Sequence, residues 1–244
     1  MRQRLDHVLA ARGLVQSRSR ARDLIARGAV RIGGEVAQKA GQLVSPDADI
    51  EVDSEANAYV ARSGAKLLAG LRGFDLSPDG CVGLDIGSST GGFTQVLLEG
   101  GARKVYAVDV GRGQLAGELA TDTRVVSLEG QDARRLTQAQ IGETVSAIVV
   151  DVSFISLLQV LPSALSFAGA DCWLVALVKP QFEVGRKGVG KGGLVREEAE
   201  IANVLDRVST FLTHRGWRVL GCLPSPLPGK KGNDEYLIGA RRDG

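Results

Sequence analysis

Cysteine and histidine are scarce in this chain of 244 residues, and their scarcity argues against two classes of protein. The three cysteines, Cys81, Cys172 and Cys222, are an odd number and stand far apart, which argues against a disulfide scaffold. No pair of them has metal-ligand spacing, and the only histidines are His7 and His214. We therefore expect no metal, and we expect the cysteines to be small buried apolar residues.

Long apolar segments are also missing. The longest apolar runs, such as 173–178, are far too short to cross a bilayer, so no membrane partner is expected. The first six residues contain no apolar core of a secretory signal, which makes a cytoplasmic location the default expectation. A hydrophobic content of 44% with 24% charged residues is ordinary for a globular protein of one large domain or two smaller ones.

Positive charge is concentrated at the N-terminal end. The formal net charge of the whole chain is only +2, whereas residues 1–39 hold nine Lys or Arg against three acids, a net charge of +6. Such a basic end is a candidate for contact with phosphates.

The first sixty residues predict a compact module. Apolar residues at helical spacing indicate a first helix that ends at Gly13, and a second that Ser17 or Ser19 caps and Gly28 ends. The glycine pair at 33–34 then predicts a two-residue hairpin turn. Two short helices, a hairpin and a basic side resemble the αL RNA-binding module first described in a small-subunit ribosomal protein.

Several arginines lie on or beside the second expected helix, where they can point toward one phosphate backbone; a solvated arginine face is the alternative. The residues that we assign to RNA binding in this module are Arg4, Arg18, Arg20, Arg22, Arg27 and Arg31.

Beyond a polar linker at 53–60, strands and helices alternate, which predicts an α/β fold with a mostly parallel sheet. We expect an RNA-binding domain over 1–58, a linker and leading helix over 59–80, and a larger domain over 81–244. The expected strands are 81–86, 104–109, 124–128, 145–150, 172–178, 217–223 and 235–240, and the expected helices lie near 92–100, 155–167 and 196–215. Prolines in the last connection disfavour a crossover helix, so the final two strands should be antiparallel.

The run Val82 to Phe93 reads as a strand, a glycine turn and a helix start, an arrangement whose free N–H groups can hold a polar ligand. Its spacing, Asp-x-Gly-x-x-x-Gly-Gly, favours S-adenosylmethionine over a dinucleotide, with a plain tight turn as the remaining alternative. Asp109 ends the next strand about twenty residues on, where nucleotide folds place a ribose-binding acid. The residues that we assign to the donor are Asp85, Gly87, Ser88, Ser89, Gly91, Gly92, Phe93 and Asp109.

Charged residues cluster at the predicted carboxyl edge of the sheet, where open α/β folds bind ligands. Asp151 and Lys179 each follow a strand, and Glu235 begins the reversed last strand at the same edge. Lys66 precedes the first strand and can reach over this edge. Charges that end strands are often only solvated, but here three strands converge on one cleft.

This set of charges suits methyl transfer to a ribose hydroxyl, which must be deprotonated or nearly so as it attacks. A lysine near other cations and shielded from water loses its proton more easily, and can act as base or as partner of the alkoxide. Carboxylates can orient the lysines and attract a sulfonium donor. The displacement is in-line, so alignment would supply most of the catalysis, and no metal is required.

A Lys-Asp-Lys-Glu set on such a sheet resembles the FtsJ/RrmJ type of RNA 2′-O-ribose methyltransferases. The segments 85–94, 107–114, 151–156, 178–183, 190–193 and 232–235, with the basic N-terminal module, resemble the TlyA (hemolysin A) family of ribosomal RNA 2′-O-methyltransferases. The resemblance spans nearly the whole chain and implies a Rossmann-like class I fold that uses S-adenosylmethionine.

The same resemblance implies methylation of a cytidine in large-subunit rRNA, and in some members of small-subunit rRNA too; the short ends favour the form restricted to the large subunit. It gives Lys66, Asp151, Lys179 and Glu235 the catalytic roles and places Asp132 at the adenine of the donor. Lys66 lies in a segment that we expect to be a loop.

The stretch 185–193 is rich in glycine and basic residues and follows Lys179. It can close over RNA and donor, with Arg186, Lys187 and Lys191 on phosphates, or it can be a mobile crossover with incidental charge.

Three other functions compete with methyl transfer: a membrane-active toxin, as the hemolysin name suggests, a nicotinamide-dependent oxidoreductase, and an RNA-binding protein without activity. The missing apolar span disfavours the toxin, and the glycine spacing disfavours the oxidoreductase. The four aligned charges disfavour a protein without activity. The sequence does not determine the oligomeric state.

Overall fold

The computed structural model describes residues 2–15, 18–26, 28–53, 60–229 and 232–244. The chain divides into two compact units, Met1–Arg62 and Ser63–Gly244. The second unit therefore begins with a helix, α4 (Ser63–Gly73), that packs against its sheet. The segment around Lys66, which we expected to be a loop, is the first turn of this helix; its apolar residues Leu67 and Leu71 are buried at helical spacing.

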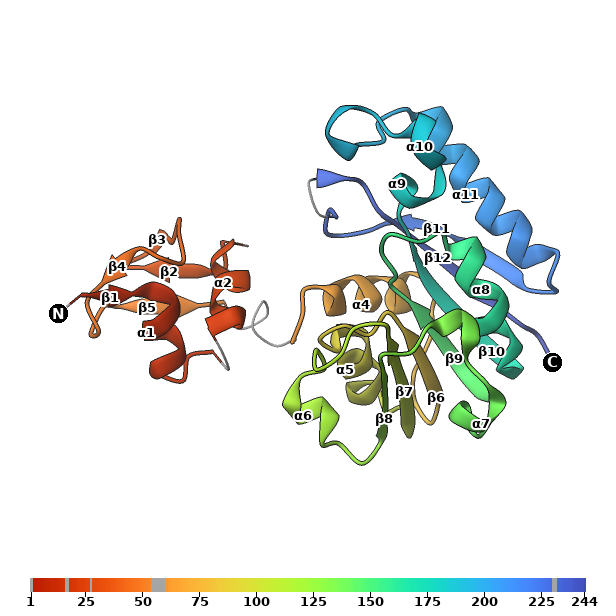
Figure 1. Cartoon of the computed structure of the whole chain (residues 1–244), viewed down its shortest axis with the longest axis horizontal. Helices are drawn as coiled ribbons and strands as arrows, with labels where there is room; N and C mark the ends of the chain where they lie inside the picture. The colour runs from red at the N-terminus through yellow and green to blue at the C-terminus, as the bar shows by residue number, and fades with distance from the viewer. Residues whose placement is uncertain (1, 16–17, 27, 54–59, 230–231) are drawn as a thin grey trace. The chain divides into compact units, whose positions relative to one another are not determined.

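The first unit has two helices over short strands (Figure 1). Its elements are β1 (Gln3–Arg4), α1 (Leu5–Ala11), α2 (Arg18–Ala26), β2 (Val30–Ile32), β3 (Glu35–Val36), β4 (Leu43–Val44) and β5 (Ile50–Val52). Strand β2 pairs antiparallel with β3 and β5, and β1 pairs antiparallel with β4. The hairpin expected at Gly33 and Gly34 is confirmed, and both glycines have the positive φ that such a turn requires.

Apolar faces of the two helices form the core of the first unit. Leu5 and Leu9 of α1 meet Leu24 of α2, and all three are fully buried. The first helix ends at Ala11, two residues before Gly13, the expected cap. The positive φ of Gly13 accompanies hydrogen bonds from its own N–H to the Ala10 carbonyl and from the Leu14 N–H to the Leu9 carbonyl. Ser17, expected as a cap of the second helix, lies outside the described residues, as does the side chain of Ser19.

The second unit is built on one seven-stranded sheet of order β11-β12-β10-β9-β6-β7-β8. The strands are β6 (Val82–Ile86), β7 (Lys104–Asp109), β8 (Val125–Glu129), β9 (Val145–Val150), β10 (Ala168–Val178), β11 (Arg218–Pro224) and β12 (Tyr236–Arg241). Neighbours from β10 to β8 are parallel, whereas β12 runs antiparallel to β10 and to β11. The mostly parallel sheet and its reversed last strand are as the sequence predicts.

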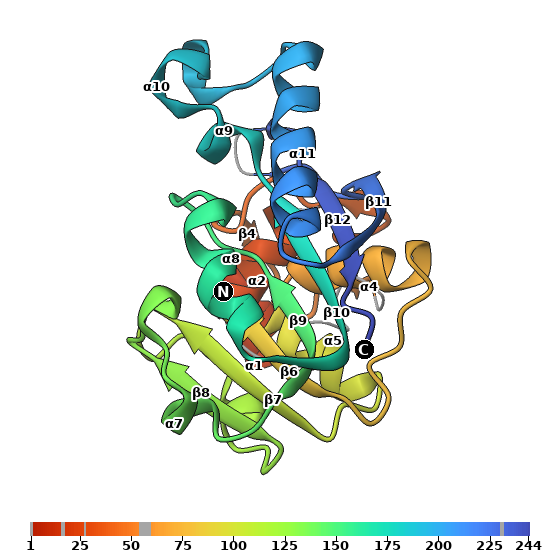
Figure 2. The same ribbon diagram turned by 90° about the vertical axis from the view of Figure 1, so that its right-hand side faces the viewer.

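Helices cover both faces of this sheet (Figures 1 and 2). Helices α4 and α5 (Gly92–Glu99) pack on one face, and α8 (Leu157–Ser166) and α11 (Glu198–Thr213) pack on the other. In α8, Leu157, Leu161 and Leu165 recur every four residues and are buried against the sheet. This double cover explains why the central strands are continuous apolar runs.

Short helical turns complete the connections. They are α6 (Gly117–Ala120), η1 (Ala133–Arg135), α7 (Gln138–Ile141), α9 (Pro180–Glu183), α10 (Gly185–Gly188) and η2 (Lys191–Gly193). The stretch 185–193, which we treated as one loop, thus contains two such turns. Its glycines hide them from a reading based on helix propensity.

Strand β10 begins earlier than its apolar run, which starts at Cys172. Ala168 already pairs with Val145, and the register then shifts before Trp173 pairs with Ala147. Asp171 lies inside this irregularity with a φ of 57°. Irregular pairing breaks the apolar pattern, so the sequence shows only the regular half of the strand.

A large-to-small change in the first unit tests the described core. We expect Leu24→Ala to destabilise this unit by about 2–5 kcal/mol, because it leaves a cavity in a small core. Hydrogen exchange of the amides of residues 3–52 in the full-length chain measures the loss. Leu43 is exposed in the same unit, so Leu43→Ala is the matched control and should cost less than about 0.5 kcal/mol. Equal exchange in both variants would contradict the packing.

Candidate active site

The glycine turn after β6 is shaped by close backbone approaches. Gly87 has a φ of 84°, its N–H donates to the Val108 carbonyl at 2.8 Å, and a Cβ at this position would collide with the Asp151 carbonyl. Gly91 has a φ of 99° and directly precedes α5. The turn therefore requires glycine at both positions.

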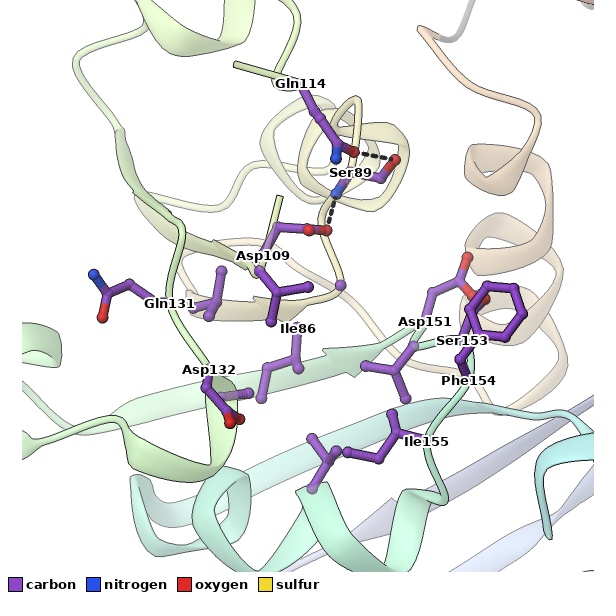
Figure 3. A pocket seen from close by; sticks show the side chains of 16 residues that line it. Ile86, Ser89, Asp109, Gln114, Gln131, Asp132, Asp151, Ser153, Phe154 and Ile155 are labelled. Carbon is purple, nitrogen blue, oxygen red and sulfur yellow. Dashed lines mark hydrogen bonds between the residues drawn. The ribbon is translucent and has the colours of Figure 1, made fainter. Parts of the chain in front are cut away.

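A pocket of 420 Å³ lies at the carboxyl ends of β6, β7 and β9 (Figure 3). Of the residues assigned from the sequence, it is lined by Gly87, Ser89, Asp109, Asp132 and Asp151. The other members of the glycine run do not line it, because they are buried: Asp85, Ser88, Gly91, Gly92 and Phe93. Gln114, Gln131, Ser153 and Phe154 also line the pocket, and sequence reasoning did not assign them.

Asp109 holds two backbone segments at the pocket wall. Its Oδ2 accepts the Ser89 N–H at 2.8 Å (Figure 3). Its Oδ1 accepts the Gly111 N–H at 2.7 Å. The Ser89 hydroxyl donates to Gln114 at 3.3 Å. A carboxylate has about four acceptor sites, so these two bonds leave Asp109 able to accept the hydroxyls of a ligand.

Asp132 lines the same pocket but is already engaged. Its carboxylate caps η1 by accepting the Arg134 N–H and forms an ion pair with the Arg134 guanidinium at 2.6 Å. These hydrogen bonds lower the pKa of Asp132 to about 2. A contact of this carboxylate with an adenine would therefore share it with Arg134.

The two lysines and two carboxylates singled out from the sequence form two ion pairs. Lys66 Nζ lies 2.5 Å from Glu235 Oε2, and both side chains are buried. Lys179 Nζ lies 2.6 Å from Asp151 Oδ1 and donates to the Ser153 hydroxyl at 3.0 Å. Each buried or nearly buried ammonium thus has a carboxylate partner, as the low polarity of such a site demands.

Strand register brings the two pairs to one edge. Val178 pairs with Tyr236 across β10 and β12, so the next residues outward, Lys179 and Glu235, face each other. Opposite residues in antiparallel strands have Cα atoms about 4.5–5.5 Å apart. Helix α4, which contacts both strands, places Lys66 on Glu235.

A second set of contacts fastens the segment after Asp151 to the segment after Lys179. Glu183 accepts the Ser156 hydroxyl at 2.6 Å and the Leu157 N–H at 2.7 Å, at the start of α8. The rings of Phe154 and Phe182 lie 5.1 Å apart. Sequence reasoning missed Glu183, because an acid in a short helix gives no local signal of its partner.

Phe154 is unusual in both conformation and exposure. Its φ is 65°, in the left-handed region that non-glycine residues seldom adopt, and its side chain is 86% exposed at the pocket (Figure 3). The ring is therefore accessible to a ligand at this pocket.

Two buried polar atoms at the glycine turn lack a hydrogen bond within the described part of the chain. They are Asp85 Oδ1 and the Ser88 hydroxyl. The other oxygen of Asp85 accepts the Thr94 hydroxyl at 2.6 Å, which ties β6 to the first turn of α5. Buried polar atoms without partners are rare in folded proteins and indicate a ligand, a water or a functional strain.

Burial raises the pKa of Asp85 to about 7, and the nearby charges of Asp151 and Asp109 add to the shift, while hydrogen bonds from Thr94 oppose it. Below pH ~7 Asp85 is therefore protonated in the folded protein. In the unfolded chain the same carboxyl loses its proton above pH ~3.9.

In the first unit, three of the assigned arginines, Arg4, Arg18 and Arg22, meet at one carboxylate, Asp6. Arg31 donates to the Gly34 carbonyl at 3.0 Å in the hairpin, and Arg20 is buried. The remaining assigned residue of this unit, Arg27, lies outside the described residues, and so do the side chains of Arg186, Lys187 and Lys191.

Within the described residues, three or more His, Cys, Asp or Glu side chains nowhere gather in a way that could hold a metal ion. Over the same residues, no helix combines the length and apolar character needed to cross a bilayer.

Comparison with known proteins defines the class to which this fold and site belong. Residues 59–242 match the FtsJ-like methyltransferase family, and residues 3–50 match the S4 domain. The second unit is therefore a methyltransferase domain, and the first is an S4 domain.

Individual relatives narrow the class. The 16S/23S rRNA (cytidine-2′-O)-methyltransferase TlyA of Mycobacterium tuberculosis is 46% identical over 98% of this chain and 90% of its own length. Hemolysin A of Brachyspira hyodysenteriae is 39% identical over 96% of this chain and 98% of its own. A solved hemolysin-type structure from Streptococcus thermophilus superposes with a TM-score of 0.79 at 38% identity, covering 99% of this chain and 89% of that one. The chain belongs to the TlyA/hemolysin A family of FtsJ-like rRNA methyltransferases.

The raised pKa of Asp85 predicts a pH dependence of stability. Between pH ~4 and ~7 the folded state binds the proton that the unfolded state has lost, so Asp85 contributes less to stability as the pH rises. Asp85→Asn cannot ionise, and the free energy of unfolding of the wild type should therefore fall relative to this variant across that window. Urea unfolding of both proteins at several pH values measures the difference; a difference that does not change with pH would contradict the assignment.

Proposed function

We propose that this protein transfers a methyl group from S-adenosylmethionine to the ribose 2′-hydroxyl of a cytidine in large-subunit rRNA. The observation that carries the proposal is the pair of lysine–carboxylate ion pairs at one edge of the sheet, of which Lys179–Asp151 adjoins the pocket because Asp151 lines it. The substrate follows from the relatives, because the Mycobacterium tuberculosis protein and its Campylobacter jejuni relative are both named for cytidine-2′-O methylation of 23S rRNA. An rRNA substrate places the protein in the cytoplasm, with a ribosomal subunit as its partner.

The residues of the pocket fit the donor. Gly87 lets the turn pack directly against the Asp151 carbonyl at the pocket wall, and Ser89 and Gln114 add polar side chains to the lining. Asp109 would accept the ribose hydroxyls, and Asp132 would lie at the adenine. When bound, the donor supplies a methyl group on a positively charged sulfur.

The two ion pairs support attack by a hydroxyl. Lys66 and Lys179 would hold the 2′-oxygen between them, where an ammonium stabilises the negative charge that grows as the hydroxyl loses its proton. Asp151 and Glu235 keep the ammonium groups oriented. The 2′-oxygen would take the methyl group as the carbon–sulfur bond of the donor breaks, and its proton would pass to the neutral amine of one lysine while the other lysine, as an ammonium, stabilises the oxygen.

The exposed ring of Phe154 supports an RNA substrate. Proteins that act on a single nucleotide unstack its base and hold it against an aromatic side chain. Phe154 lies at the pocket next to Ser153, the hydrogen-bond partner of Lys179, so a base stacked on this ring would bring its ribose to the lysines.

A membrane-active toxin, suggested by the name of the Brachyspira hyodysenteriae relative, is the less favoured function. It leaves the two buried ion pairs and the adjoining pocket without a role. Leakage of liposomes by the purified protein would support it instead.

Lys179 is the residue whose loss tests the chemistry most directly. We expect Lys179→Ala to lower methyl transfer at least about 100-fold, because the attacking oxygen loses its cationic partner. Transfer of a labelled methyl group to rRNA gives the rate, and calorimetry gives the donor affinity, which should change little. Lys104→Ala removes a lysine paired with Glu143 at the start of β7 and is the control. Turnover retained by Lys179→Ala would refute the assignment.

The position of the methyl group in the product identifies the nucleotide on which the enzyme acts. A 2′-O-methyl group blocks alkaline cleavage of the next phosphodiester bond, because the 2′-hydroxyl is the nucleophile of that cleavage. We expect mapping of rRNA from cells with and without this protein to show one protected cytidine in large-subunit rRNA that depends on it. A methyl group on a base, or identical maps, would overturn the proposed function.

A further inference from the structure

One buried carboxylate in the S4 domain gathers three arginines. The side chain of Asp6, in the first turn of α1, is fully buried. Its Oδ1 accepts from Arg4 Nε at 3.0 Å, and its Oδ2 accepts from Arg4 Nη2 at 3.2 Å, Arg18 Nη2 at 3.2 Å and Arg22 Nε at 3.0 Å. The hydrogen bonds from Arg4, and then those from Arg22 and Arg18, hold the pKa of Asp6 well below its usual range against the effect of burial.

The arginines reach this carboxylate from two elements. Arg4 precedes α1 in the short strand β1, whereas Arg18 and Arg22 lie four residues apart on α2 and so share one face of that helix. Helices α1 and α2 pack against each other, which puts Asp6 between the two sources. The carboxylate thus joins three cations that the backbone alone would not bring together.

The arginine side chains remain at the surface although their anchor does not. They are 49%, 48% and 56% exposed for Arg4, Arg18 and Arg22. An arginine has five N–H donors, and the bonds to Asp6 use two from Arg4 and one each from Arg18 and Arg22. Three cations against one anion leave the cluster with a net charge of +2, so it suits the phosphates of a nucleic acid.

We propose that Asp6 is a positioning residue for RNA binding, which presents Arg4, Arg18 and Arg22 as one preformed phosphate-binding surface. The inference rests on the proposed rRNA substrate. Free arginine side chains lose conformational freedom when they bind a phosphate, and side chains already held by a buried carboxylate lose less. Asp6 itself touches no RNA, because its carboxylate is buried.

The direction in which RNA affinity changes distinguishes a positioning role of Asp6 from a purely electrostatic effect of its charge. Asp6→Asn raises the charge of the RNA-binding unit by one, and counting charges alone predicts tighter RNA binding with a steeper salt dependence. If Asp6 positions the arginines, the same change weakens binding despite the added positive charge. A role confined to fold stability would leave the RNA affinity of the folded protein unchanged.

The experiment measures binding of the full-length protein to an in vitro transcribed large-subunit rRNA fragment by fluorescence anisotropy at several salt concentrations. We expect Asp6→Asn to weaken binding about tenfold, because the arginines must be ordered on binding. Asp47 is an exposed acid of the same unit, and Asp47→Asn, which changes the charge equally, is the matched control. It should bind as tightly as the wild type or slightly tighter.

A folding measurement and a second variant guard against the case in which Asp6→Asn simply unfolds the S4 domain. Hydrogen exchange of residues 3–52 shows whether Asp6→Asn leaves the unit folded. Asp6→Glu keeps the charge but moves the carboxylate by one methylene, and once hydrogen exchange shows that this variant is folded, it too should bind RNA more weakly. If the folded variants bind RNA as tightly as Asp47→Asn, the proposal is overturned.

Arginine variants show whether a negative result concerns only the positioning role of Asp6 or RNA binding by the arginines themselves. Arg18→Ala and Arg22→Ala should each weaken binding if the S4 domain contacts RNA through this surface. Full affinity in both would overturn the RNA role of the cluster. Weaker binding in both, together with unchanged binding by the Asp6 variants, would overturn only the positioning role.

Discussion

Burial of a lysine ammonium is costly unless a carboxylate meets it, and this chain buries two at one edge of its sheet. The reversal of β12 meets the requirement for Lys66. Because β12 runs antiparallel to β10, its first residues lie at the edge where the parallel strands end, and Glu235 arrives beside Lys179. A parallel last strand would carry Glu235 to the opposite edge and leave Lys66 without its partner.

The pocket wall and the Lys179–Asp151 ion pair share one backbone contact. Gly87 packs so closely on the Asp151 carbonyl that no Cβ fits between them. The turn that shapes the pocket therefore also fixes the residue that pairs with Lys179. Glu183 adds a second connection by fastening the segment after Lys179 to the start of α8. Alignment of an in-line displacement depends on such fixed distances.

Both units use carboxylates to hold cationic side chains in place. In the S4 domain Asp6 holds three surface arginines, and in the methyltransferase domain Asp151 and Glu235 hold two lysines. In each case a buried or nearly buried carboxylate fixes the direction of a flexible cation before a substrate arrives. Preorganisation of this kind lowers the cost of binding and favours the transition state.

From the sequence we could predict the alternating elements, the glycine hairpin, the reversed last strand and the edge at which the charged residues collect. These features follow from local periodicity and turn chemistry, which neighbouring residues carry. Other features required the folded structure: Lys66 meets Glu235 across 169 positions, Leu157 meets Glu183 across 26, and the start of β10 depends on pairing with β9. Contacts between distant segments leave no local pattern, because their geometry exists only after the sheet has formed.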